Sequence, residues 1–150
     1  MDVVLSTLHV VGAVFVVGPM AILPMTALRA LRAGNTAQVS TLAKSTAVFS
    51  YLSLVVFVLG FALVGMADPK YHLSVTTPWV LWSIVAYVVA VILSLVIVVP
   101  TLRRAGARAA GENSADAVAV PMTGYGMIGA GSGAVSLLLV LVVVLMVWKP

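Results

Sequence analysis

The chain has no cysteine, and only four of its 150 residues are acidic. Without cysteine it can form neither a disulfide nor a thiolate metal site, and it has no cysteine nucleophile. The acidic residues are Asp2, Asp68, Glu112 and Asp116, and none lies inside a long apolar run. Because proton relays and ion pathways within membranes usually use carboxylates, transport through such a relay is not expected.

Charge is scarce throughout, since 63% of the residues are hydrophobic, 8% are charged and the mean hydropathy is +1.22. Soluble domains are roughly 45–50% apolar and about 25% charged. Four apolar runs are long enough to cross a bilayer. The sequence therefore predicts an all-α membrane protein, a bundle of four transmembrane helices within one integral membrane domain over residues 1–150. The predicted spans are about 3–28, 46–66, 79–99 and 121–148.

The first predicted helix, over about 3–28, contains two prolines and one histidine. Pro19 and Pro24 each lack the N–H that would bond a carbonyl four residues earlier, so a bend that faces protein rather than lipid is expected. His9 and Gly12 share one face of this helix by helical spacing. The small residues on that face should allow another helix to approach closely.

Capping residues predict where the next helices begin. Asn35 followed by Gln38 resembles a capping pair, so the second helix should start near Thr36. Thr77 followed by Pro78 predicts the start of the third helix, because proline suits the first helical position. Pro100 is expected to mark the far end of that helix.

The fourth helix is rich in glycine in its first half. Gly124, Gly126 and Gly129 form a GxGxxG pattern, but no strand precedes it, so a dinucleotide site is not expected. Gly126 with Ala130, and Gly129 with Gly133, are spaced four apart, which favours close helix packing. Together with Gly12, these residues are the predicted packing positions.

Basic residues are divided unequally between the two predicted ends of the bundle. Two lie at one end, Lys70 and Lys149, and six at the other: Arg29, Arg32, Lys44, Arg103, Arg104 and Arg108. The positive-inside rule then places both termini outside the cytoplasm of a bacterial plasma membrane. This topology also explains the net charge of +4 without a nucleic-acid partner.

The two halves of the chain resemble each other where each odd-numbered helix ends. Residues 24–29 and 100–104 both run from proline to arginine, and both precede a glycine. Two helical hairpins in the same orientation would make a parallel repeat. Equally, the inner end of any helix tends to show proline, arginine and glycine, so both interpretations stay open.

His9 and His72 are the candidate cofactor-binding residues. The predicted topology puts both at the same side of the membrane, and two imidazoles suit haem iron, copper or zinc. The alternative is that His9 bonds a neighbouring helix and His72 is a solvated loop residue. The chain shows no Ser–His–acid set at matched depth and no cluster with the spacing of a catalytic zinc site, so no catalytic residue is assigned.

Residues Leu8 to Gly18, with His9 followed by small residues, resemble the opening of small bacterial four-helix proteins described as predicted integral membrane proteins. More distantly they resemble the copper-resistance-D and J-type protoporphyrinogen oxidase membrane families. In the haem-linked relatives a first-helix histidine is implicated in haem binding. That resemblance implies a haem-ligand role for His9 alone.

Three functions are compatible with the sequence. The first is a non-catalytic accessory or assembly subunit, whose partners are the lipid bilayer and other membrane subunits or a second copy. The second is a haem-b or quinone-linked redox protein that uses His9. The third is a small transporter, which the sequence favours least because no span carries an ionisable group of the usual kind other than His9.

Overall fold

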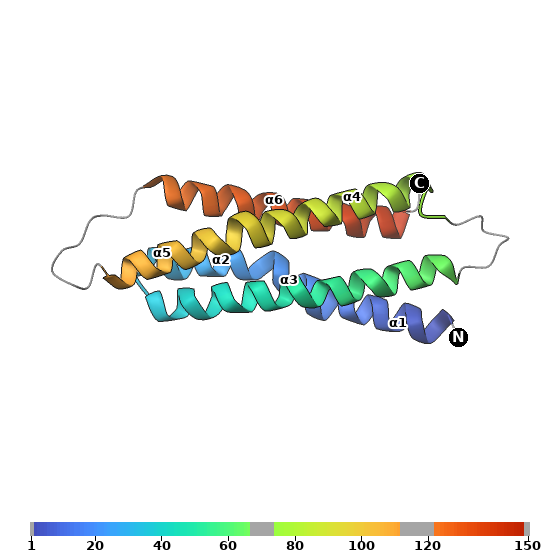
Figure 1. The fold of residues 1–150 in the computed structure, drawn as a ribbon, viewed down its shortest axis with the longest axis horizontal. Helices are drawn as coiled ribbons and strands as arrows, with labels where there is room; N and C mark the ends of the chain where they lie inside the picture. The colour runs from blue at the N-terminus through green and yellow to red at the C-terminus, as the bar shows by residue number, and fades with distance from the viewer. Residues whose placement is uncertain (1, 67–73, 112–121, 149–150) are drawn as a thin grey trace.

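The computed structural model describes residues 2–66, 74–111 and 122–148, and it shows a bundle of long helices (Figure 1). Two short segments, η1 and η3, are wider π-helical turns that join α-helices end to end. The elements are α1 (Asp2–Gly12), η1 (Ala13–Val17), α2 (Gly18–Arg32), α3 (Thr36–Gly65), α4 (Pro78–Ile92), η3 (Leu93–Val98), α5 (Val99–Gly111) and α6 (Met122–Trp148).

Joined in this way, the described residues contain four helices that are long and apolar enough to cross a membrane. They cover Val3–Arg32, Thr36–Gly65, Pro78–Gly111 and Tyr125–Trp148. The shortest has 24 residues, which corresponds to about 36 Å and exceeds a hydrocarbon core of about 30 Å. The predicted all-α bundle of four membrane-spanning helices is confirmed.

The spans pair as two helical hairpins that pack on each other. α2 packs on α3 and α4 packs on α6, while contacts of α3 with α5 and of α2 with α6 hold the hairpins together. Both hairpins begin at the same end of the bundle in Figure 1. At the other end, which we call the basic end, α2 and α5 end and α3 begins (Figure 1). These parts of the helices contain the basic residues Arg29, Arg32, Lys44, Arg103, Arg104 and Arg108.

The core is concentrated in the half of the bundle near the basic end. Met20, Val39, Leu102 and Ile128 are fully buried there, and Leu28 is almost so. Toward the opposite end α1 packs on α3 and α4 packs on α6, and the two pairs diverge in Figure 1. All four spans therefore pack most closely in one half of the bundle, and the two helix pairs diverge toward the other end.

The π turn η1 lies directly before Pro19. Within it the N–H of Gly18 bonds to the carbonyl of Ala13, five residues earlier instead of four. Such a turn shifts the hydrogen-bond pattern of the helix by one residue, so the helix can continue although Pro19 has no backbone N–H to donate. Farther along, Pro24 is buried inside α2, as expected for a bend that faces protein.

The second π turn, η3, corrects the predicted end of the third span. The N–H of Val99 bonds to the carbonyl of Ser94, again five residues back, just before Pro100. Because the wide turn accommodates Pro100, the helix continues to Gly111. The prediction that Pro100 ends this helix near residue 99 was therefore wrong.

Both predicted helix starts are observed, with one difference in their hydrogen bonds. The Asn35 side chain accepts a hydrogen bond of 3.1 Å from the backbone N–H of Gln38, as predicted for the start of α3. Pro78 opens α4 after Thr77, also as predicted. The hydroxyl of Thr77, however, accepts from the backbone N–H of Ser74 at 3.0 Å rather than from the helix.

Candidate functional site

His9 belongs to α1, and its side chain lies against α3 toward the end of the bundle where α1 begins. Its Nδ1 is 3.0 Å from the backbone carbonyl oxygen of Val56 on α3. A carbonyl can only accept, so Nδ1 carries a proton in this hydrogen bond. The imidazole is thus held in one orientation by a neighbouring span.

Two glycines make room for this contact. A Cβ atom at Gly60 would lie 3.1 Å from Cε1 of His9, and one at Gly12 would lie 2.9 Å from Cγ2 of Val56. One glycine is on α1 and the other on α3, so each helix lacks a side chain where the other projects one. The predicted packing residue Gly12 therefore lies at a close approach of the first two spans.

The described residues offer one ligand for a haem or a metal at this place. An imidazole whose Nδ1 donates to a carbonyl is oriented as metal-ligating histidines usually are. Among the residues that the structure describes, no three His, Cys, Asp or Glu side chains come together as a metal site. The other candidate, His72, lies outside the described residues. His9 would be the residue that holds a haem or metal there, and no second imidazole is placed beside it in the described part of the chain.

A buried row of hydroxyl groups connects the second and third spans. The hydroxyl oxygens of Ser50 and Ser94 are 2.8 Å apart, and both side chains are fully buried. Ser53 donates to the carbonyl of Ser50 at 2.8 Å and lies 2.7 Å from the Tyr87 hydroxyl. Since Ser53 has one proton to donate, Tyr87 must be the donor between those two. We call these four residues the hydroxyl row.

Aromatic packing extends the contact between these two spans. The ring of Tyr87 stacks on Phe57 with centroids 4.6 Å apart, and Phe57 meets Phe61 edge to face at 4.8 Å. The sequence analysis predicted no role for any residue of the hydroxyl row. The signal that could have found Tyr87 and Ser94 is their spacing of seven residues, which places two hydroxyl groups on one helix face.

A further hydroxyl joins the last span to the first. The single hydroxyl proton of Ser136 on α6 is shared between the backbone carbonyl of Ala21, at 2.8 Å, and that of Ser132, at 3.0 Å. The carbonyl that Pro24 leaves without a backbone donor is that of Met20, the residue before Ala21. In the described spans, these polar contacts are between uncharged groups whose hydrogen bonds are made within the protein.

One side of α6 packs into the bundle through its glycines. A Cβ at Gly131 would lie 3.1 Å from the Val98 side chain, and one at Gly129 would lie 3.6 Å from Leu28. The absence of side chains there lets α6 approach both the first and third spans. Of the predicted packing residues on α6, Gly129 therefore faces the bundle.

The other predicted residues of α6 face outward. A Cβ at Gly126 or at Gly133 would meet nothing within 4 Å, and Ala130 is exposed. These three residues lie on one face at helical spacing, and the next residue along it, Leu137, is 73% exposed. We call Gly126, Ala130 and Gly133 the outer stripe of α6.

The residues used to predict orientation are exposed at the basic end. These residues are Arg29, Arg32, Arg103, Arg104 and Arg108. No described carboxylate lies near these arginines, because residues 3–66, 74–111 and 122–148 contain no aspartate or glutamate.

Comparison with known proteins gives one clear finding. Residues 3–150 match the model of a family described as "Predicted integral membrane protein (DUF2269)". No curated protein and no solved structure gives a significant match.

Proposed function

Since the chain belongs to the DUF2269 family of predicted integral membrane proteins, we propose that it is a non-catalytic accessory or assembly subunit of a larger bacterial membrane complex. The observation that carries this proposal is the outer stripe of α6, a row of small residues that no described part of the chain covers. Its partner is a helix of another membrane subunit or of a second copy of this chain.

Glycine on an outward face needs a physical reason. Each glycine inside a helix costs about 0.5–1 kcal/mol relative to alanine, so Gly126 and Gly133 together cost roughly 1–2 kcal/mol. Lipid tails gain nothing from small side chains, whereas a second helix gains close backbone packing. The spacing of Gly126 and Ala130, four residues apart, is that of helix-pair motifs in membranes.

The interior supports a structural rather than a catalytic role. The hydroxyl row is hydrogen-bonded within the protein, and the described spans carry no carboxylate that would accept or pass a proton. Such an arrangement fixes how the spans sit on each other. It leaves α6 as a rigid surface on which a partner helix can be positioned.

The location proposed for the protein is the bacterial plasma membrane, with both termini outside the cytoplasm. This rests on the basic residues gathered where α2 and α5 end and where α3 begins, since such residues favour the cytoplasmic side. α1 begins and α6 ends at the opposite end of the bundle (Figure 1).

The test is purification from the native membrane in a mild detergent. The unaltered chain should elute with a partner subunit or as a dimer, and Gly126→Leu and Gly133→Leu should elute without it. Gly65→Leu is the matched control, because a Cβ at Gly65 also meets nothing within 4 Å but lies on α3. Equal thermal unfolding of all four chains would show that the fold is retained. An unaltered chain that elutes only as a lone monomer would contradict the proposal.

The second candidate function is a haem-b or quinone-linked redox protein that uses His9. The hydrogen bond between Nδ1 and the Val56 carbonyl is of the kind that metal-ligating histidines usually make with their other ring nitrogen. A haem bound there would supply one-electron chemistry, and His9 would hold its iron. The purified protein would then show a Soret band that is lost in His9→Ala. The same spectrum of His72→Ala tests whether the second histidine also binds the haem. A colourless preparation from native membranes would exclude a haem protein.

A further inference from the structure

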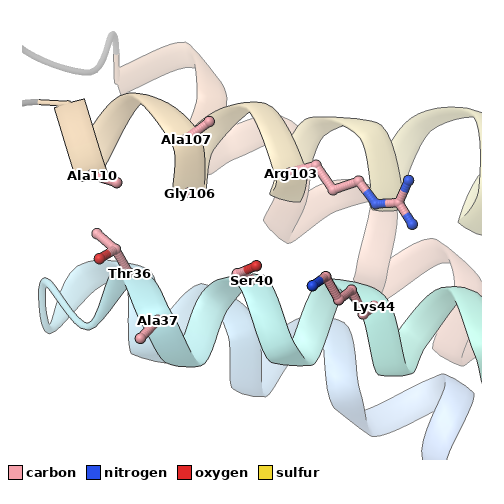
Figure 2. A pocket seen from close by; sticks show the side chains of 8 residues that line it. All are labelled: Thr36, Ala37, Ser40, Lys44, Arg103, Gly106, Ala107 and Ala110. Carbon is pink, nitrogen blue, oxygen red and sulfur yellow. The ribbon is translucent and has the colours of Figure 1, made fainter.

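A groove with both polar and apolar lining residues lies between α3 and α5 at the basic end of the bundle. Its volume is about 600 Å³, and residues of both helices line it. In Figure 2, Ser40 of α3 points toward α5, Lys44 lies along the side of α3 that faces α5, and Arg103 extends along α5 on the facing side. The helices are in close contact beside it, since a Cβ at Gly106 would lie 3.0 Å from Val39.

The two cations of the groove lie at the same depth. Lys44 is eight residues after the start of α3, and Arg103 is eight residues before the end of α5, so each is about 12 Å from its helix end. The uncharged stretch from residue 45 to 65 is about 32 Å long, close to a hydrocarbon thickness of about 30 Å. Lys44 and Arg103 therefore lie near the boundary between lipid tails and head groups.

The groove has positive charge that no described residue neutralises. Lys44 and Arg103 are exposed, and the described ranges after Asp2 contain no carboxylate. Thr36 and Ser40 add hydroxyl donors along the same wall. Such a set of donors suits an anion with several oxygens, because arginine can hold two oxygens of a phosphate at once.

We propose that this groove binds a phosphate group, and that an anionic lipid of the adjacent leaflet supplies it. Arg103 and Lys44 hold the phosphate oxygens from the two helices, and Ser40 donates to the same group. The lipid tails then lie along the bundle toward the hydrocarbon core. Basic pockets between membrane helices at this depth recognise anionic lipid head groups by the same chemistry.

A specific site differs from general attraction to a charged membrane surface. Arg104 follows Arg103 directly, is also exposed and carries the same charge, but it does not line the groove. General attraction would respond equally to the loss of either arginine. A bound phosphate would respond to Arg103 and Lys44 and hardly to Arg104.

The experiment uses the full chain in nanodiscs of phosphatidylcholine containing a minor fraction of phosphatidylglycerol. Native mass spectrometry then counts the lipids that stay bound. Phosphatidylglycerol should be retained in preference to phosphatidylcholine. Its affinity should fall about tenfold in Lys44→Gln and in Arg103→Gln, which each lose a charge-assisted hydrogen bond. Arg104→Gln, the matched control, should change it less than about twofold.

Other outcomes would overturn the proposal. Equal losses in Arg103→Gln and Arg104→Gln would mean surface attraction without a site. No preference for phosphatidylglycerol in the unaltered chain would exclude an anionic lipid as the ligand of the groove. A separate arm adds inorganic phosphate to the chain in neutral detergent without anionic lipid. Thermal stabilisation that requires Arg103 in that arm would identify a soluble phosphate as the ligand and exclude the lipid as its source. Partner binding at α6 is unaffected by either result.

Discussion

Substituting Gly60 by alanine should reveal whether His9 lies against α3 as the structure shows. The new methyl group would lie 3.1 Å from Cε1 of the imidazole, which is tighter than an ordinary contact. The ring must move by a few tenths of an ångström, and the 3.0 Å hydrogen bond from Nδ1 to Val56 lengthens. The substitution therefore has one stabilising and one destabilising effect.

Their magnitudes nearly cancel in the unaltered background. Replacing glycine by alanine inside a helix stabilises it by about 0.5–1 kcal/mol. Weakening the hydrogen bond of His9 costs up to about 1 kcal/mol. Gly60→Ala alone should therefore change the free energy of unfolding by less than about 0.5 kcal/mol. In a His9→Ala background no imidazole is left to displace, so the same change should stabilise by the full 0.5–1 kcal/mol or so.

The assay is a double-mutant cycle on the purified chain, unfolded by denaturant in mixed micelles and followed by circular dichroism. The expected coupling between the two positions is about 1 kcal/mol. Gly133→Ala is the control, because a Cβ there meets nothing within 4 Å and should stabilise equally in both backgrounds. Equal stabilisation by Gly60→Ala in both backgrounds would refute the contact between His9 and Gly60.

Two further predictions concern the hydroxyl row. Tyr87→Phe removes the hydrogen bond to Ser53 and should lower the free energy of unfolding by about 0.6 kcal/mol, the average for such bonds in membranes; an unchanged denaturation midpoint would contradict the bond. In this cysteine-free chain, the variant with Ser50→Cys and Ser94→Cys should form a disulfide on mild oxidation, because the two hydroxyl oxygens are 2.8 Å apart. The control is the variant with Ser83→Cys and Ser94→Cys, whose two thiols lie on one helix and should stay reduced on a non-reducing gel. If the thiols at positions 50 and 94 also stayed reduced, the packing of α3 on η3 would be contradicted.

The sequence was sufficient to predict the spans and most helix starts, because these depend on local residues. Long apolar runs, the Asn35 cap and Pro78 act within a few residues of where they lie. The prediction from Pro100 was wrong because the hydrogen bonding of the preceding turn decides whether a proline ends a helix. A π turn over Leu93–Val98 lets the helix continue, and nothing in that apolar run distinguishes a wide turn from a regular one.

Contacts between spans could not be predicted from the sequence, since they depend on which helices become neighbours. Ser83 bonds the carbonyl of Trp79 in its own helix, whereas Ser50 finds Ser94 on another span. A membrane serine can do either, so its partner follows only from the fold. The glycines of α6 show the same limit: their spacing predicts packing, but only the bundle shows that Gly129 faces inward and Gly126 outward.

Photo-crosslinking from the outer stripe in the native membrane tests the proposed role most directly. A photoreactive amino acid at position 130 should join the chain to a defined protein, seen as a discrete heavier band. The same group at position 143, where Val143 is 54% exposed on a different face of α6, should yield little beyond lipid adducts. Lipid adducts at both positions, with no protein band, would contradict the account of this chain as a subunit of a larger complex.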